Sequence, residues 1–488
     1  MTHDVLVIGG GLAGMTAALR AAQAGAQVRL LARAAPGAMG NSAASGGGLL
    51  IAGPNITRQA HYDLTLAVGH GINEPSLVDT LSRDAPACRE WLEETMGFKL
   101  SVKDKGGQGY FSPGGGALIT AKVAEAVARE GRIEAHPWPV RRLLTRDGAV
   151  VGALVEAGDG LRPIHASATV LATGGYAGLF ARHDNPGDPM GAGVVMAARA
   201  GARVRDLEFV QFYPIATAEP SLPTFMLFRP FAPGARLLTQ DGHDLLAERF
   251  GGRSLNEVVG AARDDLSRIV HEENARAPVV FDATGCDWSQ ADKWFSLVYL
   301  RRYDWDWEHR PARVAPIAHH CMGGVAIDAH ARTSLARLFA AGEVAAGVHG
   351  ANRHGSNSLT DCLVFGCHAG DEAAGVTAAS EQEMAEAWPG EIVPERADFA
   401  ALQRLVWEGM GIVRDAAGMA RLATALEALA PSDAQLMAQM ALAFARRRTE
   451  SRGAHIRADY PAEDPAWAHS QVGRLARDGM AFEPTVNG

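Results

Sequence analysis

The stretch that decides the fold is DVLVIGGGLAGMTAALRAAQAGAQVRLL, residues 4–31. Its apolar start predicts a strand that leads into Gly9, Gly11 and Gly14, and an alanine-rich helix and a second strand are predicted to follow. The first glycine permits a tight turn, the second lets the backbone approach a pyrophosphate, and the third lets the helix pack on the strand. The pyrophosphate would lie against the exposed N–H groups at the helix N-terminus. This stretch therefore predicts a dinucleotide site.

Two later segments repeat the pattern of an apolar strand that ends in glycine. They are TVLATGG, residues 169–175, and RLFAAGE, residues 337–343. A nicotinamide domain needs only the first fingerprint, so three separated segments indicate a more extended dinucleotide. Glu343 is placed to accept hydrogen bonds from ribose hydroxyls. The second segment continues into GVHGANRHGSNSL, residues 347–359, which adds another glycine-rich turn before a helix.

Nine motifs together give the chain a family resemblance. They occur in family order between residue 4 and about residue 465, and they are GGGLAG, NSAASGGG, AHYDLTLAVGHGINEPSLVD, VLATGGYAG, AGARVRDLEFVQF, AARDDLSRIVHEE, IAHHCMGG, AAGEVAAGVHGANRHGSNSL and ESRGAHIRADYP. The chain resembles the flavoprotein family of succinate dehydrogenase, fumarate reductase and L-aspartate oxidase, as a short and divergent member. The resemblance implies FAD as the cofactor. The ESRGxH segment is interpreted as a structural contact with the flavin domain.

The resemblance also implies how FAD is held. The respiratory members attach FAD covalently through a histidine in the loop that matches residues 37–48, and this chain has no histidine there. Noncovalent FAD is therefore expected. The predicted cofactor-binding residues are Gly9, Gly11, Leu12, Ala13, Gly14, Arg33, Asn41, Ser42, Ser45, Gly46, Gly47, Ala172, Thr173, Gly174, Glu343, Asn357, Ser358 and Leu359.

Composition excludes several other classes of protein. The 488 residues carry a net charge of −9 with both signs interspersed, so nothing favours a nucleic-acid partner. No apolar run is long enough to span a membrane, and the chain begins on a core strand without a predicted signal peptide. The five cysteines form no CxxC pair, so neither a disulfide framework nor a metal or iron–sulfur site in this chain is predicted. A soluble, cytoplasmic protein is expected.

Three domains are predicted, and the fold class is α/β. Residues 1–212 and 317–385 alternate strand and helix patterns and form one discontinuous, Rossmann-like FAD-binding domain. Residues 213–316 are richer in Pro, Trp and charge, and the resemblance implies an inserted α+β capping domain that closes over substrate. Residues 390–488 show apolar side chains at helical spacing as far as about residue 447, which predicts a helical C-terminal domain.

The resemblance assigns catalytic roles to Arg263, His319 and Arg353. Arg353, in GANRHGSNSL, matches the family arginine that grips a substrate carboxylate, and its planar fork suits two-point binding. His319, in AHHCMGG, matches the substrate-binding histidine, whereas His320 is interpreted as packing. Arg263, in AARDDLSR, matches the family proton donor. Because a guanidinium hardly deprotonates, stabilisation of developing negative charge is the more conservative role.

The chain departs from the respiratory members at the other end of the predicted substrate pocket. Tyr213 stands in place of a histidine, and residues 227–233, LFRPFAP, replace a run that carries a Glu/Arg pair for proton resupply. Tyr213 and Arg229 are predicted to shape this end, while His319 and Arg353 hold the carboxylate. Arg229 binds an anionic group of a different substrate or lies on the surface, and both alternatives stay open. Succinate, fumarate and L-aspartate themselves are not the expected substrates.

The predicted activity is that of an FAD-dependent oxidoreductase that interconverts a saturated carboxylic acid and its α,β-unsaturated form. An oxidase of a small amino acid, as in L-aspartate oxidase, is the nearest alternative. The other is a flavin electron-transfer subunit that works with a ferredoxin-like or other iron–sulfur partner. A non-catalytic flavin-binding protein gives no reason for Arg263, His319 and Arg353 all to occupy family positions.

Overall fold

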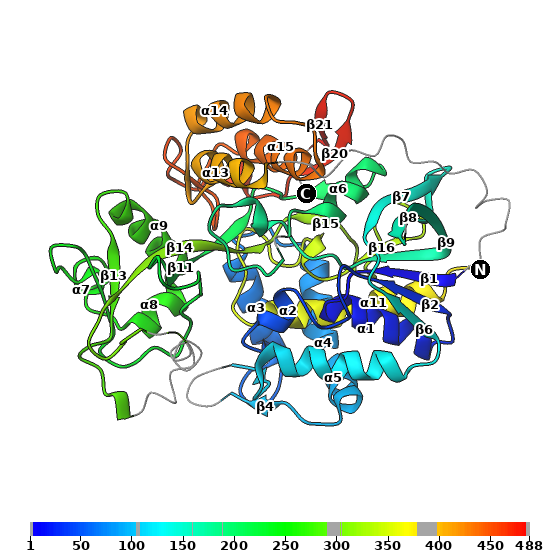
Figure 1. The fold of residues 1–488 in the computed structure, drawn as a ribbon, viewed down its shortest axis with the longest axis horizontal. Coiled ribbons are helices and arrows are strands. Elements are labelled where there is room, and N and C mark those ends of the chain that lie inside the picture. The colour runs from blue at the N-terminus through cyan, green and yellow to red at the C-terminus, as the bar shows by residue number, and fades with distance from the viewer. Residues whose placement is uncertain are drawn as a thin grey trace.

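The fold has three regions, and the glycine-rich N-terminal unit belongs to the largest of them (Figure 1). A computed structural model describes residues 3–103, 108–158, 160–187, 189–289, 303, 305–377 and 398–484. The regions are a large α/β body, a lobe of green elements on one side of it, and a layer of orange helices with a red pair of strands over another side. The α/β class with an additional helical C-terminal layer, predicted from the sequence, is confirmed.

The α/β body is built on a seven-stranded sheet in the order β6-β2-β1-β9-β8-β7, with β16 also paired to β9. Strands β6, β2, β1, β9 and β16 are parallel, and β7, β8 and β9 form an antiparallel meander. Parallel strands put their carboxyl ends at one edge, so the three predicted glycine-rich turns come together there. The sheet strands are β1 (His3–Ile8), β2 (Val28–Leu31), β6 (Ile133–His136), β7 (Val140–Arg146), β8 (Ala149–Ala157), β9 (Gly160–Leu171) and β16 (Leu338–Ala340).

Helices α1 and α11 pack side by side against this sheet. A Cβ atom on Gly366 would lie 2.9 Å from the Ala13 oxygen, and one on Gly370 would lie 2.5 Å from the Ala17 oxygen, so these glycines let the two helices approach closely. Both helices begin at the edge of the sheet where the glycine-rich turns meet. The helices of the body are α1 (Leu12–Gln23), α2 (Asn41–Ala44), α3 (Arg58–Val68), α4 (Pro75–Met96), α5 (Gly115–Arg129), α6 (Ala192–Arg199) and α11 (Asn357–Ala374).

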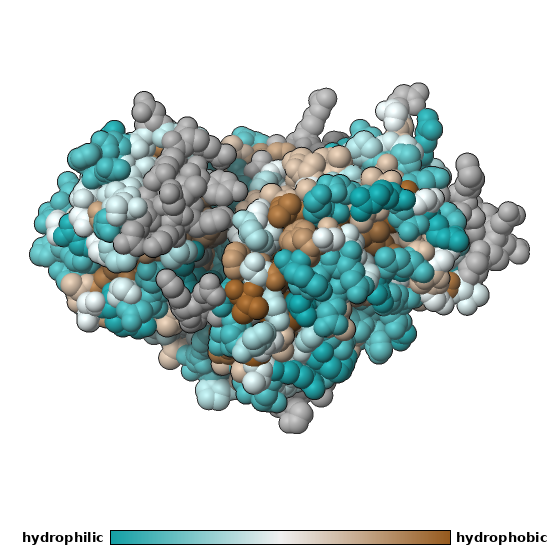
Figure 2. All heavy atoms as spheres, turned by 90° about the horizontal axis from the view of Figure 1, so that it is seen from below, coloured by the Kyte–Doolittle hydropathy of each residue, from teal (hydrophilic) through white to brown (hydrophobic). Residues whose placement is uncertain are grey.

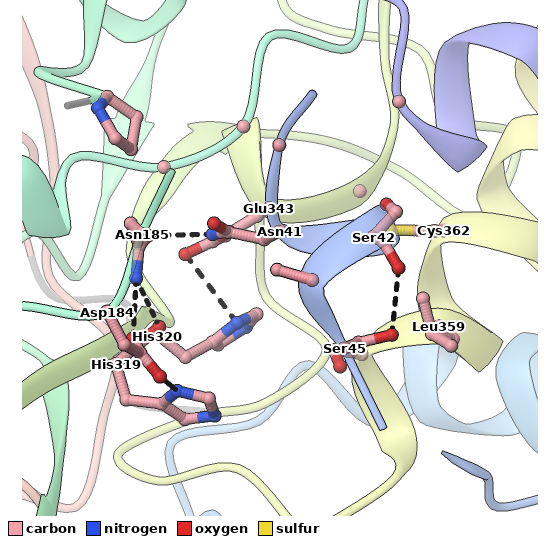
Figure 3. A pocket seen from close by; sticks show the side chains of 18 of the residues that line it. Asn41, Ser42, Ser45, Asp184, Asn185, His319, His320, Glu343, Leu359 and Cys362 are labelled. Atoms are coloured by element: carbon pink, nitrogen blue, oxygen red, sulfur yellow. Dashed lines mark hydrogen bonds and ion pairs between the residues drawn. The ribbon is translucent and has the colours of Figure 1, made fainter. Parts of the chain in front are cut away.

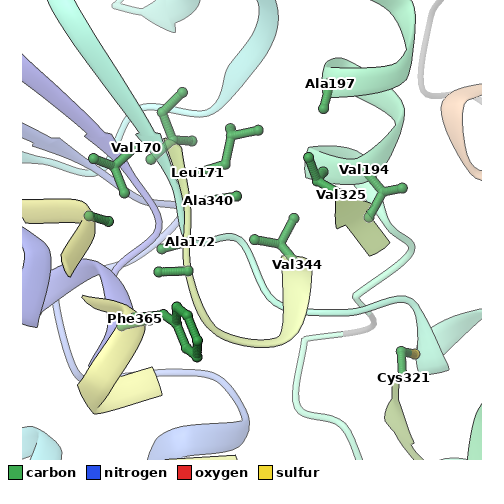
Figure 4. Packing of buried hydrophobic residues seen from close by; sticks show 14 of the residues in the cluster. Val170, Leu171, Ala172, Val194, Ala197, Cys321, Val325, Ala340, Val344 and Phe365 are labelled. Atoms are coloured by element: carbon green, nitrogen blue, oxygen red, sulfur yellow. The ribbon is translucent and has the colours of Figure 1, made fainter. Parts of the chain in front are cut away.

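The core lies between the sheet and these helices. Val170, Leu171 and Ala340 lie on the adjacent strands β9 and β16, and Phe365 of α11 packs beneath their ends (Figure 4). All four side chains are buried. Burial of this kind removes apolar surface from water at about 25 cal/mol per Å². The core therefore fixes the ends of β9 and β16, where the glycine-rich turns begin.

The lateral lobe is built on a four-stranded antiparallel sheet in the order β11-β14-β13-β12. It has its own hydrophobic cluster, whose buried members run from Tyr213 to Ile317. This cluster supports the predicted capping domain over residues 213–316, whose boundaries stay a prediction; residues 290–302 and 304 lie outside the described ranges. The elements of the lobe are β11 (Val210–Thr217), β12 (Arg236–Leu238), α7 (Leu245–Phe250), α8 (Leu255–Ala261), α9 (Arg263–Asn274), β13 (Val279–Asp282) and β14 (Ala312–Cys321).

The C-terminal layer contains the predicted helices α13 (Phe399–Met410), α14 (Ala416–Glu427) and α15 (Asp433–Arg447). It also contains a hairpin that the helical prediction omitted, which pairs with β10 and completes a five-stranded sheet in the order β17-β15-β10-β20-β21. The domain boundaries at residues 385 and 390 fall outside the described ranges. The remaining strands are β3 (Gly48–Leu49), β4 (Ser101–Val102), β5 (Tyr110–Phe111), β10 (Val204–Arg205), β15 (Gly324–Ala326), β17 (Ala345–Ala346), β18 (Val413–Arg414), β19 (Ile456–Arg457), β20 (Val472–Ala476) and β21 (Gly479–Phe482).

Hydrophilic side chains cover most of the face that Figure 2 shows, and the apolar patches on it are small and scattered. Among the described residues, no helix has both the length and the apolar character that a membrane crossing requires. The cytoplasmic location predicted from the sequence stays a prediction.

Candidate active site

One cavity of about 2250 Å³ runs from the glycine-rich turns of the body to the capping lobe. Pockets that bind a drug-sized ligand have volumes of up to about 1000 Å³. This cavity is more than twice as large, so it has room for a dinucleotide together with a small substrate. All the predicted cofactor and substrate residues line it except Gly14 and Asn357. The structure therefore brings together in one cavity residues that lie more than three hundred positions apart in the sequence.

The turn between β1 and α1 forms the cradle at one end of the cavity. Gly9 has φ +127°, and a Cβ atom on it would lie 2.1 Å from the Ala172 oxygen. A Cβ atom on Gly14 would lie 1.9 Å from the Gly9 oxygen, so Gly14 serves the packing of α1 rather than the cavity. Gly11 caps α1 without a side-chain hydrogen bond and with no acidic residue in the first helical turn. The exposed N–H groups and the helix dipole suit an anion here.

The short helix α2 and the loop after it form the next part of the cavity wall (Figure 3). The Ser42 hydroxyl accepts a hydrogen bond of 3.3 Å from the Leu12 N–H at the start of α1. The Ser45 hydroxyl donates to the Ser42 carbonyl at 2.8 Å, which holds the loop against its own helix. Gly46 and Gly47 follow with their backbone facing the cavity. This loop thus leads from the α1 N-terminus toward the capping lobe.

Glu343 is buried where strand β16 ends, and both of its oxygens are engaged. One oxygen accepts from the Cys321 N–H at 3.0 Å, and the other accepts from the Asn41 side-chain amide at 2.9 Å. Burial raises the pKa of this carboxyl, and the hydrogen bonds oppose the rise. Gly175 leaves space for it, because a Cβ atom there would lie 2.5 Å from a Glu343 oxygen. Glu343, which was predicted to bind a ribose, therefore also links α2 to β14.

His320 lies beside Glu343, with its Nδ1 3.6 Å from a carboxylate oxygen. It packs edge-on against His349 at a ring-centroid distance of 5.4 Å, as its interpretation as a packing residue requires. Its Nε2 is buried and has no hydrogen-bond partner among the described residues, and the side chain lines the cavity. Burial, reinforced by the charge of Arg353, lowers the pKa of His320 well below its usual value. A neutral imidazole therefore faces the cofactor end of the cavity.

Asn357, at the first position of α11, lies outside the cavity lining. Its oxygen bonds the His61 ring at 2.9 Å, and its amide donates to the Thr65 hydroxyl at 3.0 Å. The side chain thus anchors the α11 N-terminus to α3, whereas its neighbours Ser358 and Leu359 line the cavity.

These residues fit FAD. The cradle is shaped by glycines whose Cβ atoms would collide with backbone, and Gly174 has open space beside a positive φ of +79°. The N-terminal N–H groups of α1 are directed at the place where a pyrophosphate is expected. Thr173 adds a buried hydroxyl without a partner among the described residues. The groups that would hold FAD are the β1–α1 turn, the α2 loop, the Thr173–Gly174 turn and Glu343 with the α11 N-terminus.

Two arginines lie at the other end of the cavity, Arg353 buried and Arg263 partly buried. Arg353 donates from Nη2 to the Gln211 oxygen at 2.9 Å and from Nη1 to the His354 carbonyl at 3.2 Å. Arg263, the first residue of α9, donates from Nη2 to the Arg353 carbonyl at 2.8 Å. The Nε of each guanidinium is buried and has no partner among the described residues. Burial, then the neighbouring charge of Arg263, lowers the pKa of Arg353 to about 9, so Arg353 remains cationic at neutral pH. Burial also lowers the pKa of Arg263.

His319 completes this end of the cavity, and it is hydrogen-bonded to a residue that no motif predicted. Its Nδ1 lies 2.8 Å from an Asp184 oxygen, as Figure 3 shows. Asn185 steadies the pair, because its amide donates to the other Asp184 oxygen at 2.9 Å and to the His319 carbonyl at 3.0 Å. The Asn41 amide in turn donates to the Asn185 oxygen at 2.7 Å. With Nδ1 engaged, Nε2 is the ring atom of His319 left for a ligand.

Tyr213 and Arg229 both line the cavity, as expected from the sequence. The Tyr213 ring meets the His319 ring edge-on at 6.0 Å, and burial raises the pKa of its hydroxyl. Arg229 is exposed and is held at 3.4 Å from the Asn256 carbonyl. The Arg229 side chain thus lies both at the surface and at the wall of the cavity.

Sequence reasoning missed two polar residues of this site, Asp184 and Lys103. Asp184 follows a glycine-rich turn in a segment without periodicity, and Lys103 lies in a polar loop that looks solvated in the sequence. The Lys103 ammonium instead donates to the Ser356 hydroxyl at 2.7 Å inside the cavity wall. Neither residue carries a local signal, because their neighbours in space come from β14 and from the α11 N-terminus.

Comparison with known proteins gives the chain a family. A model described as "FAD binding domain" matches residues 4–359, and one described as "Fumarate reductase flavoprotein C-term" matches residues 423–484. The chain is similar to L-aspartate oxidase of Agrobacterium fabrum, with 34% identity over 94% of this chain and 91% of the relative. It is also similar to L-aspartate oxidase of Caulobacter vibrioides, with 34% identity over 96% and 95% of the two chains.

The fold agrees with these matches. A structure of E. coli quinol fumarate reductase superimposes with a TM-score of 0.86 at 24% identity, over 100% of this chain and 98% of that one. The FAD-binding model covers well over half of the chain and contains every predicted cofactor residue. The chain therefore belongs to the FAD-dependent oxidoreductase family of succinate dehydrogenase, fumarate reductase and L-aspartate oxidase flavoproteins.

Proposed function

We propose that this protein interconverts a saturated carboxylic acid and its α,β-unsaturated form with noncovalently bound FAD. The observation that carries the proposal is a pair of arginines, the buried Arg353 and the partly buried Arg263, at the end of the cavity away from the dinucleotide cradle. Each keeps a buried Nε–H without a partner among the described residues. Buried cations with unused donors are matched to an anion, and a carboxylate accepts two guanidinium N–H groups at once.

The chain's own residues bind and orient the substrate. Gln211 and the His354 carbonyl fix the Arg353 guanidinium, so little side-chain entropy is lost when it clamps a carboxylate. The carboxylate then lies between the α11 N-terminus and the first turn of α9. FAD, when bound, supplies the exchange of a hydride with one of the two carbons that form the double bond, and a proton is exchanged at the other. The walls that exclude water there are Tyr213 and the capping lobe.

Arg263 stabilises charge during the reaction, and His319 handles the proton. The Arg263 guanidinium lies beside Arg353 and stabilises negative charge that develops on the substrate carbon skeleton. The His319 ring faces the cavity through Nε2, because Asp184 holds Nδ1. Nε2 is therefore the atom at which a proton is held or released during turnover. Arg263, His319 and Arg353 are thus the proposed catalytic residues, and Tyr213 and Arg229 shape the wall of the cavity beside them.

Oxidation of a small amino acid, with oxygen as the electron acceptor, is the second candidate. The observation that favours it is the 34% identity to relatives named L-aspartate oxidase. The two candidates use the same arginine clamp and differ in the substituent on the carbon that exchanges the hydride. An electron-transfer role with a ferredoxin-like iron–sulfur partner is the third candidate, and the L-aspartate oxidase relatives make it the least favoured.

Reoxidation of the reduced protein separates the candidates. The FAD form is photoreduced without oxygen, and fumarate or larger enoates are added while the visible flavin band is followed. We expect at least one enoate to restore the oxidised spectrum, and Arg353→Met to abolish this while a matched Arg446→Met change on an exposed helix face does not. Reoxidation by oxygen after reduction with L-aspartate, with peroxide release and no response to enoates, would establish the oxidase instead. Rapid exchange with a ferredoxin alone would establish the electron-transfer role.

A further inference from the structure

The capping lobe presents apolar side chains to the substrate end of the cavity. We call them the apolar wall, and they are Tyr213, Met226 and Phe228. Residues 225–228 run in extended form beside β11, and the Leu227 N–H donates to the Ile215 carbonyl at 2.9 Å. Successive side chains of an extended segment point to opposite sides. Leu227 is therefore buried in the lobe, whereas its neighbours Met226 and Phe228 line the cavity.

The apolar wall begins beside the catalytic residues and extends toward the cofactor end. The Tyr213 ring meets the His319 ring edge-on at 6.0 Å. Arg263 lies close enough for its charge to oppose the rise in the Tyr213 pKa that burial causes. Phe228 approaches the loop after α2, because a Cβ atom on Gly46 would lie 3.8 Å from its Cε2. A substrate whose carboxylate is held by the two arginines would therefore have these side chains beside the rest of its carbon skeleton.

Packing inside the lobe does not use all of this apolar surface. Met226 and Phe228 pack against the hydrophobic cluster of the lobe, yet both are only partly buried. Both also line the cavity, so part of their apolar surface is left for a ligand. Transfer of apolar surface out of water is favourable, and pockets for small molecules are lined mainly by apolar and aromatic side chains. The wall is therefore matched to an apolar group.

The two further cations of the cavity do not make the apolar wall an acid site. The Arg229 side chain is exposed, so water and salt screen its charge. The Lys103 ammonium donates to the Ser356 hydroxyl at 2.7 Å, at the N-terminus of α11. A carboxylate placed against Met226 and Phe228 would lose water without receiving a hydrogen bond from either side chain, which is costly.

We propose that the apolar wall is the subsite for an aryl group on the double bond, so that the substrate is a 3-aryl-2-enoate or its saturated form. The inference rests on the proposed function and adds the class of substrate, a monocarboxylate whose far end is apolar. An aryl group covers more of the wall than a methyl group does. It also gains edge-on or offset contacts with the rings of Tyr213 and Phe228.

Isothermal titration calorimetry on the oxidised FAD form tests the proposal without turnover. The probes are fumarate, crotonate and cinnamate, which share a carboxylate on a trans double bond and end in a carboxylate, a methyl and a phenyl group. We expect cinnamate to bind at least tenfold more tightly than crotonate, and fumarate to bind no more tightly than crotonate. The heat capacity change of binding should be more negative for cinnamate than for crotonate, because more apolar surface is buried.

Variants of the wall assign the preference to its side chains. Phe228→Ala should raise the dissociation constant of cinnamate by about ten- to one-hundredfold and leave that of crotonate within about threefold. Phe228→Leu should keep most of the preference, because the side chain stays apolar and large. Tyr460→Ala, which removes an exposed aromatic ring of the C-terminal layer, should bind all three probes like the unchanged protein.

Each other outcome has a definite meaning. If fumarate binds more tightly than cinnamate, or if cinnamate and crotonate bind equally, the apolar subsite is overturned while the proposed function stands. The subsite is also overturned if Phe228→Ala weakens all three probes equally. If none of the three probes binds, the carboxylate site at Arg353 itself fails, and the proposed function falls with it. The ranking on the unchanged protein decides these cases even if Phe228→Ala does not retain FAD.

Discussion

At the scale of single residues, the orientation of His319 depends on one carboxylate. Asp184 bonds Nδ1 at 2.8 Å, and Asn185 holds both partners in place. We expect Asp184→Asn to lower kcat by about 10²-fold, because the ring loses the charged partner that fixes its tautomer. The ¹⁵N chemical shifts of the His319 ring, assigned by comparison with His319→Gln, report the tautomer directly. Asp147→Asn, at an exposed turn, is the control; equal shifts in both variants would show that Asp184 does not position the ring.

The same scale shows what local sequence can and cannot reveal about the site. Arg263, His319 and Arg353 lie in motifs, and all three line one cavity. Asp184 and Lys103 do not lie in motifs. Their contact residues, His319 and Ser356, are each more than one hundred positions away in the sequence. Residues whose function depends on a partner from another element leave no spacing pattern for a single sequence to show.

At the scale of elements, the β1–α1 turn is predicted to control FAD retention. A Cβ atom on Gly14 would lie 1.9 Å from the Gly9 oxygen, which is backbone and has no room to move. We expect Gly14→Ala to shift the start of α1 away from β1 and to raise the FAD dissociation constant by about ten- to one-hundredfold. The ratio of flavin to protein absorbance after desalting measures the loss. Gly131→Ala meets nothing within 4 Å and should retain FAD like the unchanged protein; equal retention in both would contradict the cradle.

Elements with a strong local pattern were predictable. The second strand expected within residues 4–31 is observed at Val28–Leu31, and the helical spacing expected as far as about residue 447 corresponds to α13, α14 and α15. The hairpin β20–β21 was not predicted within the helical C-terminal domain. Its strands are short, and they are stabilised by pairing with β10, which lies more than two hundred and sixty residues earlier. A strand that depends on a distant edge has little signal of its own.

At the scale of the whole molecule, a buried ion network joins the C-terminal layer to the α/β body. Arg448 is fully buried and donates to Glu208 at 2.6 Å and to Glu450 at 2.9 Å. Arg452 bonds Glu450 at 2.8 Å and the carbonyl of His70 in the body at 2.8 Å. The ESRGxH segment, which was interpreted as a contact with the flavin domain, therefore works through charges that lie between the two regions.

Removing one member of this network should destabilise the whole molecule. Arg448→Met leaves the Glu208 carboxylate buried without its cation, and breaking a buried pair in this way costs about 3–5 kcal/mol in the free energy of unfolding. Urea unfolding of the FAD form measures the loss, and Arg446→Met on the exposed face of α15 should change it by less than about 0.5 kcal/mol. Glu208→Gln combined with Arg448→Met should recover part of the loss, because the unpaired charge is gone. If Arg448→Met unfolds at the same urea concentration as Arg446→Met, the network does not hold the regions together, and the contacts of β20 with β10 must do so.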